Sequence, residues 1–249
     1  MGSSRKSVSE VLKAMGEAQS VVVMRELAAA CFANAQSHYE AASLLAENDY
    51  TATAVALAVL GVEEFAKAVL YTAVALFPAE RDVLGEEERW HEVKNLIAIA
   101  AQGAQCDNEP SWAVGADYEG ASPSLTARLE SMFASLLRGG VQGLATRRVE
   151  AREYFDGLRW EYPDLPVTPD KKNDALYVGL SPTGEVWTPA RVATWAEFEI
   201  LGLRWYLDEF RALPEVLQED ERWKRFEESV GEVRRSPPTP ELGGSKGSP

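Results

Sequence analysis

Three charged residues lie within a stretch of sequence that is otherwise almost entirely apolar. Glu63, Glu64 and Lys67 occur in segment 51–77, whose other residues are mainly alanine, valine and leucine. In a helix, Lys67 follows Glu63 by four residues and Glu64 by three, so its ammonium group can pair with either carboxylate. Burying an unpaired ion costs several kcal/mol. We therefore expect these charges to have partners, either in a structural network or in a functional site.

A second polar pair lies at a matching height in the next expected helix. His91 and Lys94 are three residues apart and share one helix face. At about 1.5 Å per residue, Lys67 lies roughly 15 Å before the end of its helix, and Lys94 roughly 12 Å after the start of the following antiparallel helix. The same estimate brings Asn34 to the height of Glu63. The spacing predicts one polar layer across three helices, formed by Asn34, Glu63, Glu64, Lys67, Lys94 and His91.

Spacing alone leaves two interpretations of this layer open. It can be a closed ion-pair network that sets the register of the helices, in which removal of one partner leaves a buried, unpaired charge. It can also be a pocket that opens to solvent, in which His91→Ala has little effect on stability. Imidazole titrates near neutral pH, and ammonium groups bind anionic oxygen atoms. The second interpretation therefore implies proton transfer and phosphate binding.

The composition argues against several other kinds of site. The chain has 39 acidic and 25 basic residues, a net charge of −14, which disfavours binding of nucleic acid through an overall basic surface. Two cysteines and two histidines favour neither a disulfide framework nor a zinc site, so we expect no metal and no cofactor. Glycine-rich phosphate loops and serine-nucleophile elbows are absent. Lacking a signal-peptide pattern or an uncharged apolar span, the protein is expected in the cytoplasm and not in a membrane.

The rest of the sequence predicts the helices that would position these residues. The expected class is all-α, a helical bundle with a short extended or hairpin insert around 175–187. Segment 51–77 is apolar on nearly every face and should be the central helix. One domain is expected over 21–230, after a partly helical or disordered extension (1–20) and before a disordered tail (231–249). The expected helices are 21–47, 51–77, 86–102, 123–138, 141–159, 188–213 and 214–230.

Several motifs, taken in order, resemble those of the AbiV-like abortive-infection proteins of the HEPN superfamily. Residues 33–35 resemble part of the first family helix, and 54–68, with the Glu-Glu-Phe-Ala-Lys run, is similar to its most recognisable stretch. Residues 91–94 resemble a His-x-x-Lys motif. A later basic and Leu-Tyr-Val element is matched by 171–178 and 187–189. The resemblance covers roughly residues 25 to 210.

The resemblance implies a HEPN bundle, a role in bacterial defence against phage, and a homodimer that brings two active sites together. Many HEPN proteins are metal-independent ribonucleases, marked by an arginine four to six residues before a histidine. This chain lacks that spacing, because Arg89 is two residues before His91 and Arg81 is ten before it. The alternatives are a non-catalytic HEPN protein that binds a phage protein or part of the translation machinery, and a helical interaction module unrelated to defence.

RNA cleavage without a metal ion would assign a role to each residue of the polar layer. One group must take a proton from the ribose 2′-OH, another must protonate the leaving oxygen, and cations must stabilise the developing charge. His91 is the candidate acid or base, Lys67 and Lys94 would bind phosphate, and Glu63 or Glu64 would orient them. The further residues expected to contact RNA are Asn34, Lys171, Lys172 and Tyr177. A phage protein or an antitoxin is the expected protein partner.

Overall fold

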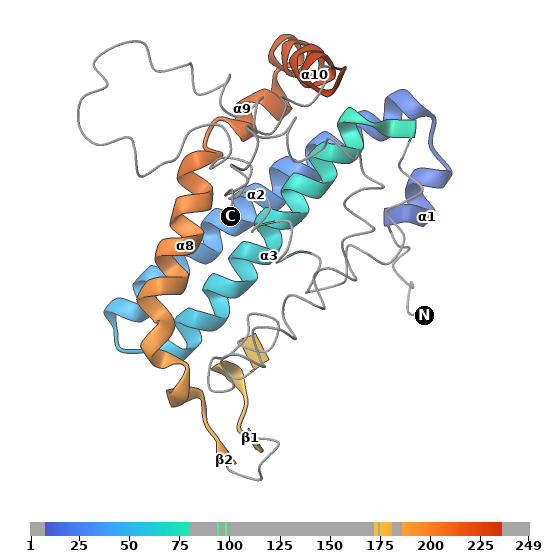
Figure 1. The fold of residues 1–249 in the computed structure, drawn as a ribbon. Coiled ribbons are helices and arrows are strands. Elements are labelled where there is room, and N and C mark those ends of the chain that lie inside the picture. Colours follow the sequence, from blue (N-terminus) through green and yellow to red (C-terminus); the bar gives the residue numbers. More distant parts are fainter. Residues whose placement is uncertain are drawn as a thin grey trace, which may run out of the picture.

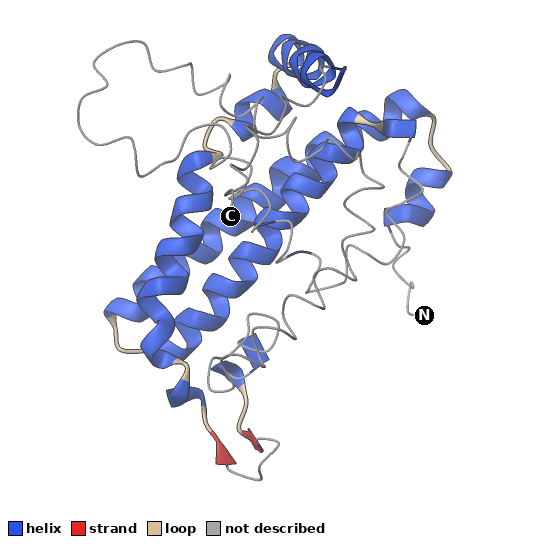
Figure 2. Ribbon diagram, in the orientation of Figure 1, coloured by secondary structure: helices blue, strands red, loops and turns tan. Residues whose placement is uncertain are grey.

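The computed structural model describes residues 8–79, 94, 98, 172–173, 175–180 and 186–235. In this part of the chain, two long helices lie antiparallel and side by side (Figure 1). They are α2 (Glu17–Glu47) and α3 (Thr51–Leu76), and α8 (Ala196–Glu209) packs against both. Helix predominates among the described residues (Figure 2), which confirms the all-α class.

Shorter elements lie at the ends of this three-helix group. Helix α1 (Val8–Lys13) precedes α2, and α9 (Leu213–Gln218) and α10 (Asp220–Arg235) follow α8. Strands β1 (Gly179–Leu180) and β2 (Val186–Trp187) form an antiparallel hairpin at the opposite end of α8 from α9 and α10. In its register, Gly179 is opposite Trp187 and Leu180 is opposite Val186.

The turn between α2 and α3 follows from the residues 45–50. Asp49 adopts the left-handed conformation, with φ 65°, which aspartate and asparagine tolerate better than other non-glycine residues. The N–H of Tyr50 donates to the Leu45 carbonyl at 2.9 Å, and that of Asp49 donates to the Ala46 carbonyl at 3.2 Å. These two bonds satisfy carbonyl groups at the end of α2 in the pattern of a Schellman motif. The tight turn brings α3 back along α2.

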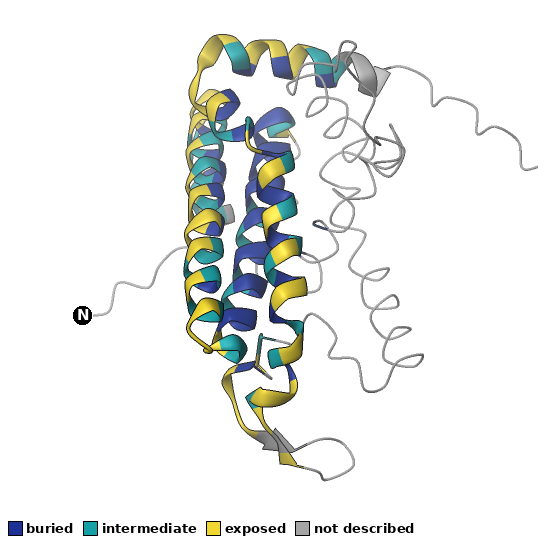
Figure 3. Ribbon diagram, turned by 90° about the vertical axis from the view of Figure 1, so that its left-hand side faces the viewer, coloured by how far each residue is buried: buried dark blue, intermediate teal, exposed yellow. Residues whose placement is uncertain are grey.

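Helix α3 is the central helix of the described bundle. Of its 26 residues, 19 are buried, on nearly all of its faces. Figure 3 shows this contrast, since α3 is mostly buried whereas the outer faces of α2 and α8 are exposed. The apolar character of 51–77 therefore predicts its position correctly, and the helix ends one residue earlier than expected, at Leu76.

Two helical glycines are in opposite environments, and their replacement by alanine should have opposite effects. A Cβ atom on Gly61 would lie 2.3 Å from Leu203 Cδ2, inside the contact between α3 and α8. Leu203 is fully buried, so we expect the overpacking, about 1–3 kcal/mol, to exceed the gain in helix propensity, about 1 kcal/mol. A Cβ atom on Gly202 would meet no atom within 4 Å. Thermal unfolding should show a lower Tm for Gly61→Ala and an equal or higher Tm for Gly202→Ala; the reverse order would contradict this packing.

The segment 188–196 differs from the single helix expected over 188–213. It forms two 3-10 turns, η4 (Pro189–Arg191) and η5 (Ala193–Trp195), before α8 begins at Ala196. Val192, between the turns, is fully buried and belongs to one apolar cluster with Val55, Val59 and Ala196. The two 3-10 turns therefore lie where this segment packs on the N-terminal part of α3. Similarly, Ala175 and Leu176, expected in a strand, are helical.

The helix expected over 214–230 is divided into α9 and α10 by a break at Glu219. Arg25 of α2 lies at this break. Its Nε donates to the Leu217 carbonyl at 2.7 Å, its Nη1 pairs with Asp220 at 2.8 Å, and its guanidinium lies 5.1 Å from the centre of the Trp223 ring. Arg25 thus satisfies a carbonyl at the end of α9 and a carboxylate at the start of α10, so a contact distant in sequence stabilises the break.

Arg25 should therefore contribute more to stability than the carboxylate with which it pairs. Its side chain is 11% exposed, whereas that of Asp220 is 80% exposed. We expect Arg25→Ala to lower the free energy of unfolding by about 1–3 kcal/mol and Asp220→Ala by about 0.5 kcal/mol or less. Urea unfolding of both variants would measure the difference. Equal losses would show that the ion pair, and not the carbonyl and ring contacts, holds α10 on α2.

Several expected elements lie outside the described residues. They include the helices expected over 123–138 and 141–159, most of 86–102 and residues 236–249 of the expected tail. The first five residues of that tail, 231–235, were expected to be disordered, but they continue helix α10, which ends at Arg235. From 86–102 the structure describes only Lys94 and Ala98, which are both helical and buried. Within the described part of the chain, no helix has the length and apolar character needed to cross a membrane.

Candidate functional site

The carboxylate of Glu63 is the centre of a buried ion-pair network. Its Oε1 accepts a hydrogen bond from Lys172 Nζ at 3.2 Å, and its Oε2 lies 3.7 Å from Lys94 Nζ. Glu63 is 4% exposed and Lys94 is 5% exposed. The network joins α3 to two helical positions elsewhere in the chain. Partners of opposite charge offset the desolvation of each ion, which an isolated buried charge could not do.

A second pair lies beside the first on α3, nearer to solvent. Lys67 Nζ donates a hydrogen bond to Glu64 Oε1, and the two side chains are 25% and 16% exposed. Asn34 and Cys31, one turn apart on α2, also hydrogen-bond to the Glu64 carboxylate. Three donor side chains from two helices therefore hold Glu64 in one orientation. Its ammonium partner Lys67 keeps part of its surface accessible.

The surroundings shift the pKa values of Glu64 and Lys94. Burial raises the pKa of Glu64, but the hydrogen bond and charge of Lys67, with hydrogen bonds from Asn34 and Cys31, outweigh burial and hold the pKa below its ordinary value. This carboxylate is therefore ionised at neutral pH and can only accept hydrogen bonds. Burial lowers the pKa of Lys94, and the attraction of Glu63 only partly opposes that effect.

The thiol of Cys31 should resist alkylation in the folded protein. Burial, followed by the negative charge of Glu64, raises its pKa to about 12. The thiolate is the reactive form, so at pH 8 this thiol should react about 10³-fold more slowly than one of ordinary pKa, and faster as the pH rises. Labelling of a Cys106→Ser variant with iodoacetamide, in buffer and in urea, tests this expectation. Equal rates in both solvents would show that Cys31 is not held as described.

The structure brings six of the residues predicted from the sequence into one cluster. Glu63 and Lys94 form its closed inner part, and Glu64 and Lys67 its more exposed outer part. Tyr177 follows the helical turn that carries Lys172, and it is 64% exposed. His91 and Lys171 lie outside the described residues. The polar cluster, as named hereafter, consists of Asn34, Glu63, Glu64, Lys67, Lys94 and Lys172.

Cys31 was not predicted from the sequence, and Lys172 lies in a different environment from the expected one. Cys31 lies one turn before Asn34 on the same face of α2, and this spacing could have indicated that the two residues act together. Lys172 was expected to contact RNA, but its amine binds the carboxylate of Glu63, which is 109 positions away in the chain. No local pattern in the sequence reveals such a contact. His38, the other histidine, is half-buried on α2 and is not part of the polar cluster.

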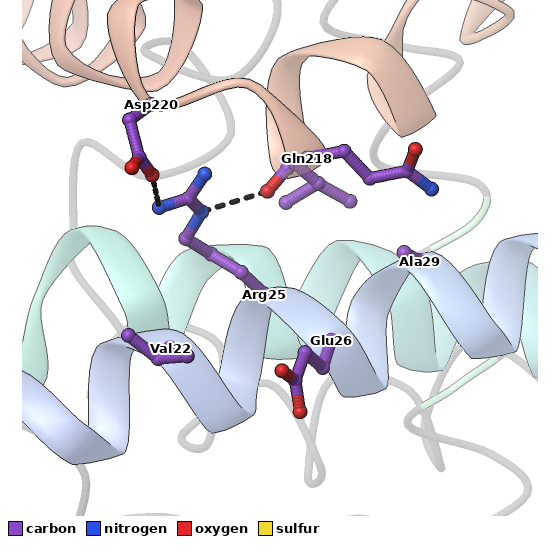
Figure 4. Close-up of a pocket in the computed structure, with 7 residues that line it drawn as sticks. Val22, Arg25, Glu26, Ala29, Gln218 and Asp220 are labelled. Atoms are coloured by element: carbon purple, nitrogen blue, oxygen red, sulfur yellow. Dashed lines mark hydrogen bonds and ion pairs between the residues drawn. The ribbon is translucent and has the colours of Figure 1, made fainter.

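Metal-binding side chains and pockets are the other features of the described chain that could form a site. No group of three or more His, Cys, Asp or Glu side chains within the described ranges could hold a metal ion. A pocket of about 500 Å³ lies between α2 and the α9–α10 junction (Figure 4). Its cation, Arg25, is already bound to the Leu217 carbonyl and to Asp220, so the pocket serves the packing of α10 better than the binding of an anion. Its lining residues are Val22, Arg25, Glu26, Ala29, Leu217, Gln218 and Asp220.

Comparison with known proteins adds one finding to this geometry. The sequence matches the model of the AbiV family of HEPN proteins over residues 23–201, which is more than half of the chain. The matched region contains every residue of the polar cluster, the hairpin and the beginning of α8, and it ends before α9 and α10. Neither curated proteins nor solved structures gave a match.

Proposed function

The chain belongs to the AbiV family of HEPN abortive-infection proteins, and on that premise we propose that it is an anti-phage effector that cleaves RNA without a metal ion. One observation carries the proposal. The polar cluster contains three lysines and two glutamates, a net positive charge in a chain whose overall charge is −14. A local excess of cations beside partly exposed groups is what binding of a phosphodiester requires.

The proposed reaction uses the ribose 2′-OH as the nucleophile. Its oxygen forms a bond to the adjacent phosphorus while the bond to the 5′ oxygen of the next nucleotide breaks, which leaves a 2′,3′-cyclic phosphate and a 5′-OH. Lys67, the more exposed lysine, stabilises the charge that develops on the phosphate oxygens. Because Glu64 is ionised, it cannot act as the acid, and it orients Lys67 instead. His91 transfers the protons in this proposal.

The remaining parts of the proposal concern RNA contacts and assembly. Tyr177 is well exposed near Lys172, so its ring is available to stack on an unpaired base. Asn34 contacts RNA from α2, and Lys171 and Lys172 approach the backbone beside the cluster. Two copies form a homodimer, in which two such sites act together in the cytoplasm. A phage protein or an antitoxin controls the activity.

An RNA-cleavage assay with matched histidine variants tests the proposed function. Purified protein should cleave RNA in the presence of EDTA and release products with 2′,3′-cyclic phosphate ends. His91→Ala should abolish cleavage with little change in Tm, because the proposal places His91 in a pocket open to solvent, where a substitution should cost about 1 kcal/mol or less. His38→Ala is the control, since His38 is outside the polar cluster, and it should cleave as the wild type does. Cleavage by His91→Ala at the wild-type rate would exclude the proposed role of His91.

A second function is favoured by the missing Arg-to-His spacing and by the closed inner part of the cluster. In this alternative, Glu63, Lys94 and Lys172 only stabilise the bundle, and the protein acts by binding a phage protein or part of the translation machinery. The same preparation separates the two functions. Two results together would support the binding function. Purified wild-type protein would not cleave RNA, and the protein would still arrest growth in cells when it carries His91→Ala.

A further inference from the structure

Helix α8 carries an apolar stripe on the side that faces away from the bundle (Figure 3). Phe198 is 67% exposed and Leu201 is 60% exposed, and Trp205, one turn further along, is partly buried. These residues are spaced by three and four positions, so they lie on one side of the helix. The opposite side, with Leu203 and Tyr206, packs into the core. Single exposed apolar residues are common, but a row of large ones on one helix indicates a contact surface.

A row of charges follows one edge of this stripe. Glu197 and Arg204 are seven residues apart, as are Phe198 and Trp205, so each pair occupies one edge of the same helix face. Both charged side chains are exposed, and Arg204 Nε pairs with Asp208 at 3.4 Å. A guanidinium has further N–H donors, which a second carboxylate can accept. The surface therefore combines an apolar row with an adjacent row that contains both charges.

The order of these residues is self-complementary when two copies of α8 pack antiparallel. Phe198 lies three residues before Leu201, and Trp205 lies four after it, so a two-fold axis beside Leu201 brings Phe198 to Trp205 of the second copy. Glu197 lies four residues before Leu201, and Arg204 three after it, so the same axis brings Glu197 to Arg204 of the second copy. Each contact occurs twice. A parallel pair would instead place the charged row of one copy against the apolar row of the other, so the charges favour the antiparallel arrangement.

We propose that a second copy of this chain docks antiparallel on α8, with Leu201 at the two-fold axis. This contact is separate from the polar cluster. Phe65 of α3 faces α8, since its ring stacks on that of Tyr206 with the ring centres 4.9 Å apart. Glu63 and Lys67 are each two residues from Phe65, about 200° around the helix, and so lie on the side of α3 away from α8. The α8 contact therefore goes beyond the homodimer of the proposed function, in which two clusters act together, and where both contacts form, the assembly has four chains.

Light scattering from the purified full-length protein, after gel filtration, tests the α8 contact. We expect Leu201→Glu to halve the molar mass, because the substitution brings two carboxylates together at the axis. Its circular dichroism should match that of the wild type, since Leu201 is exposed on the helix surface. Val22→Glu is the matched control: Val22 is 50% exposed on α2, outside the stripe, and the mass should not change. An unchanged mass in Leu201→Glu, or a wild-type mass of one chain, would overturn the proposal.

Exchange of the two charges tests whether the occupant is a second copy in this register. Glu197→Arg and Arg204→Glu should each lower the association constant about tenfold, because like charges then meet at both contacts. The double variant should recover most of the association, as measured by sedimentation equilibrium. An association constant that is as low in the double variant as in the single ones would overturn the antiparallel contact. None of these measurements uses RNA, so a mass halved by Leu201→Glu supports the contact even if RNA is never cleaved, and an unchanged mass overturns it even if RNA is cleaved.

Discussion

Glu63→Ala is expected to lower the free energy of unfolding by about 3–5 kcal/mol, because the substitution leaves Lys94 buried without its carboxylate. This loss is a large part of the 5–15 kcal/mol that typically stabilises a domain. Urea unfolding at pH 7 measures it. Glu64→Ala is the matched comparison, and it should cost about 1 kcal/mol or less, since Lys67 is 25% exposed and can be solvated. A loss below about 1 kcal/mol for Glu63→Ala would show that water reaches the network freely.

The pH dependence of stability and the effect of replacing Lys94 make this prediction more specific. Burial lowers the pKa of Lys94, so the unfolded chain binds more protons than the folded one, and stability associated with this group rises with pH toward its ordinary value of 10.5. Removing Glu63 deletes the attraction that opposes this shift, so the rise with pH should be steeper in Glu63→Ala. Lys94→Met should cost less than Glu63→Ala, because Glu63 then keeps Lys172.

The second large effect is expected on activity. Lys67→Met should reduce RNA cleavage, and with it growth arrest, by about 10²–10³-fold, the usual effect of removing one group that stabilises the transition state. The Tm should change little, because Lys67 lies in the more exposed part of the polar cluster. Cleavage rates of purified protein and toxicity in cells are the two measurements. Lys67→Arg, which keeps the charge, should recover part of the activity.

The control for Lys67 is another lysine in the same local pattern. Lys224 pairs with Glu221 three residues earlier, as Lys67 pairs with Glu64, but it lies on the exposed side of α10. Lys224→Met should leave both cleavage and Tm unchanged. If both substitutions lowered activity equally, a general loss of positive charge would explain the result, and Lys67 would have no specific role.

The sequence predicted the elements whose signals are local. The almost entirely apolar segment 51–77 indicated a central helix, and α3 is that helix, because burial on nearly all faces requires apolar residues at most positions of every turn. The rise per residue of an α-helix was sufficient to predict that Asn34 and Lys94 lie at the height of Glu63 and Glu64, because α-helices have a nearly constant pitch. Local patterns did not predict the break between α9 and α10 at Glu219, because Arg25, which stabilises this break, lies on another helix.

The identity of each ion-pair partner was decided by the tertiary structure alone. Within α3, Lys67 could have paired with Glu63 or with Glu64, since both spacings allow contact. The packed bundle buries Glu63 and leaves Glu64 and Lys67 nearer to solvent, so Lys67 pairs with Glu64, and Glu63 takes Lys94 and Lys172 from distant parts of the chain. The sequence by itself determined that charges would be buried in this helix. Which of them are closed off from solvent depends on how neighbouring segments pack, because desolvation is a property of the assembled surroundings.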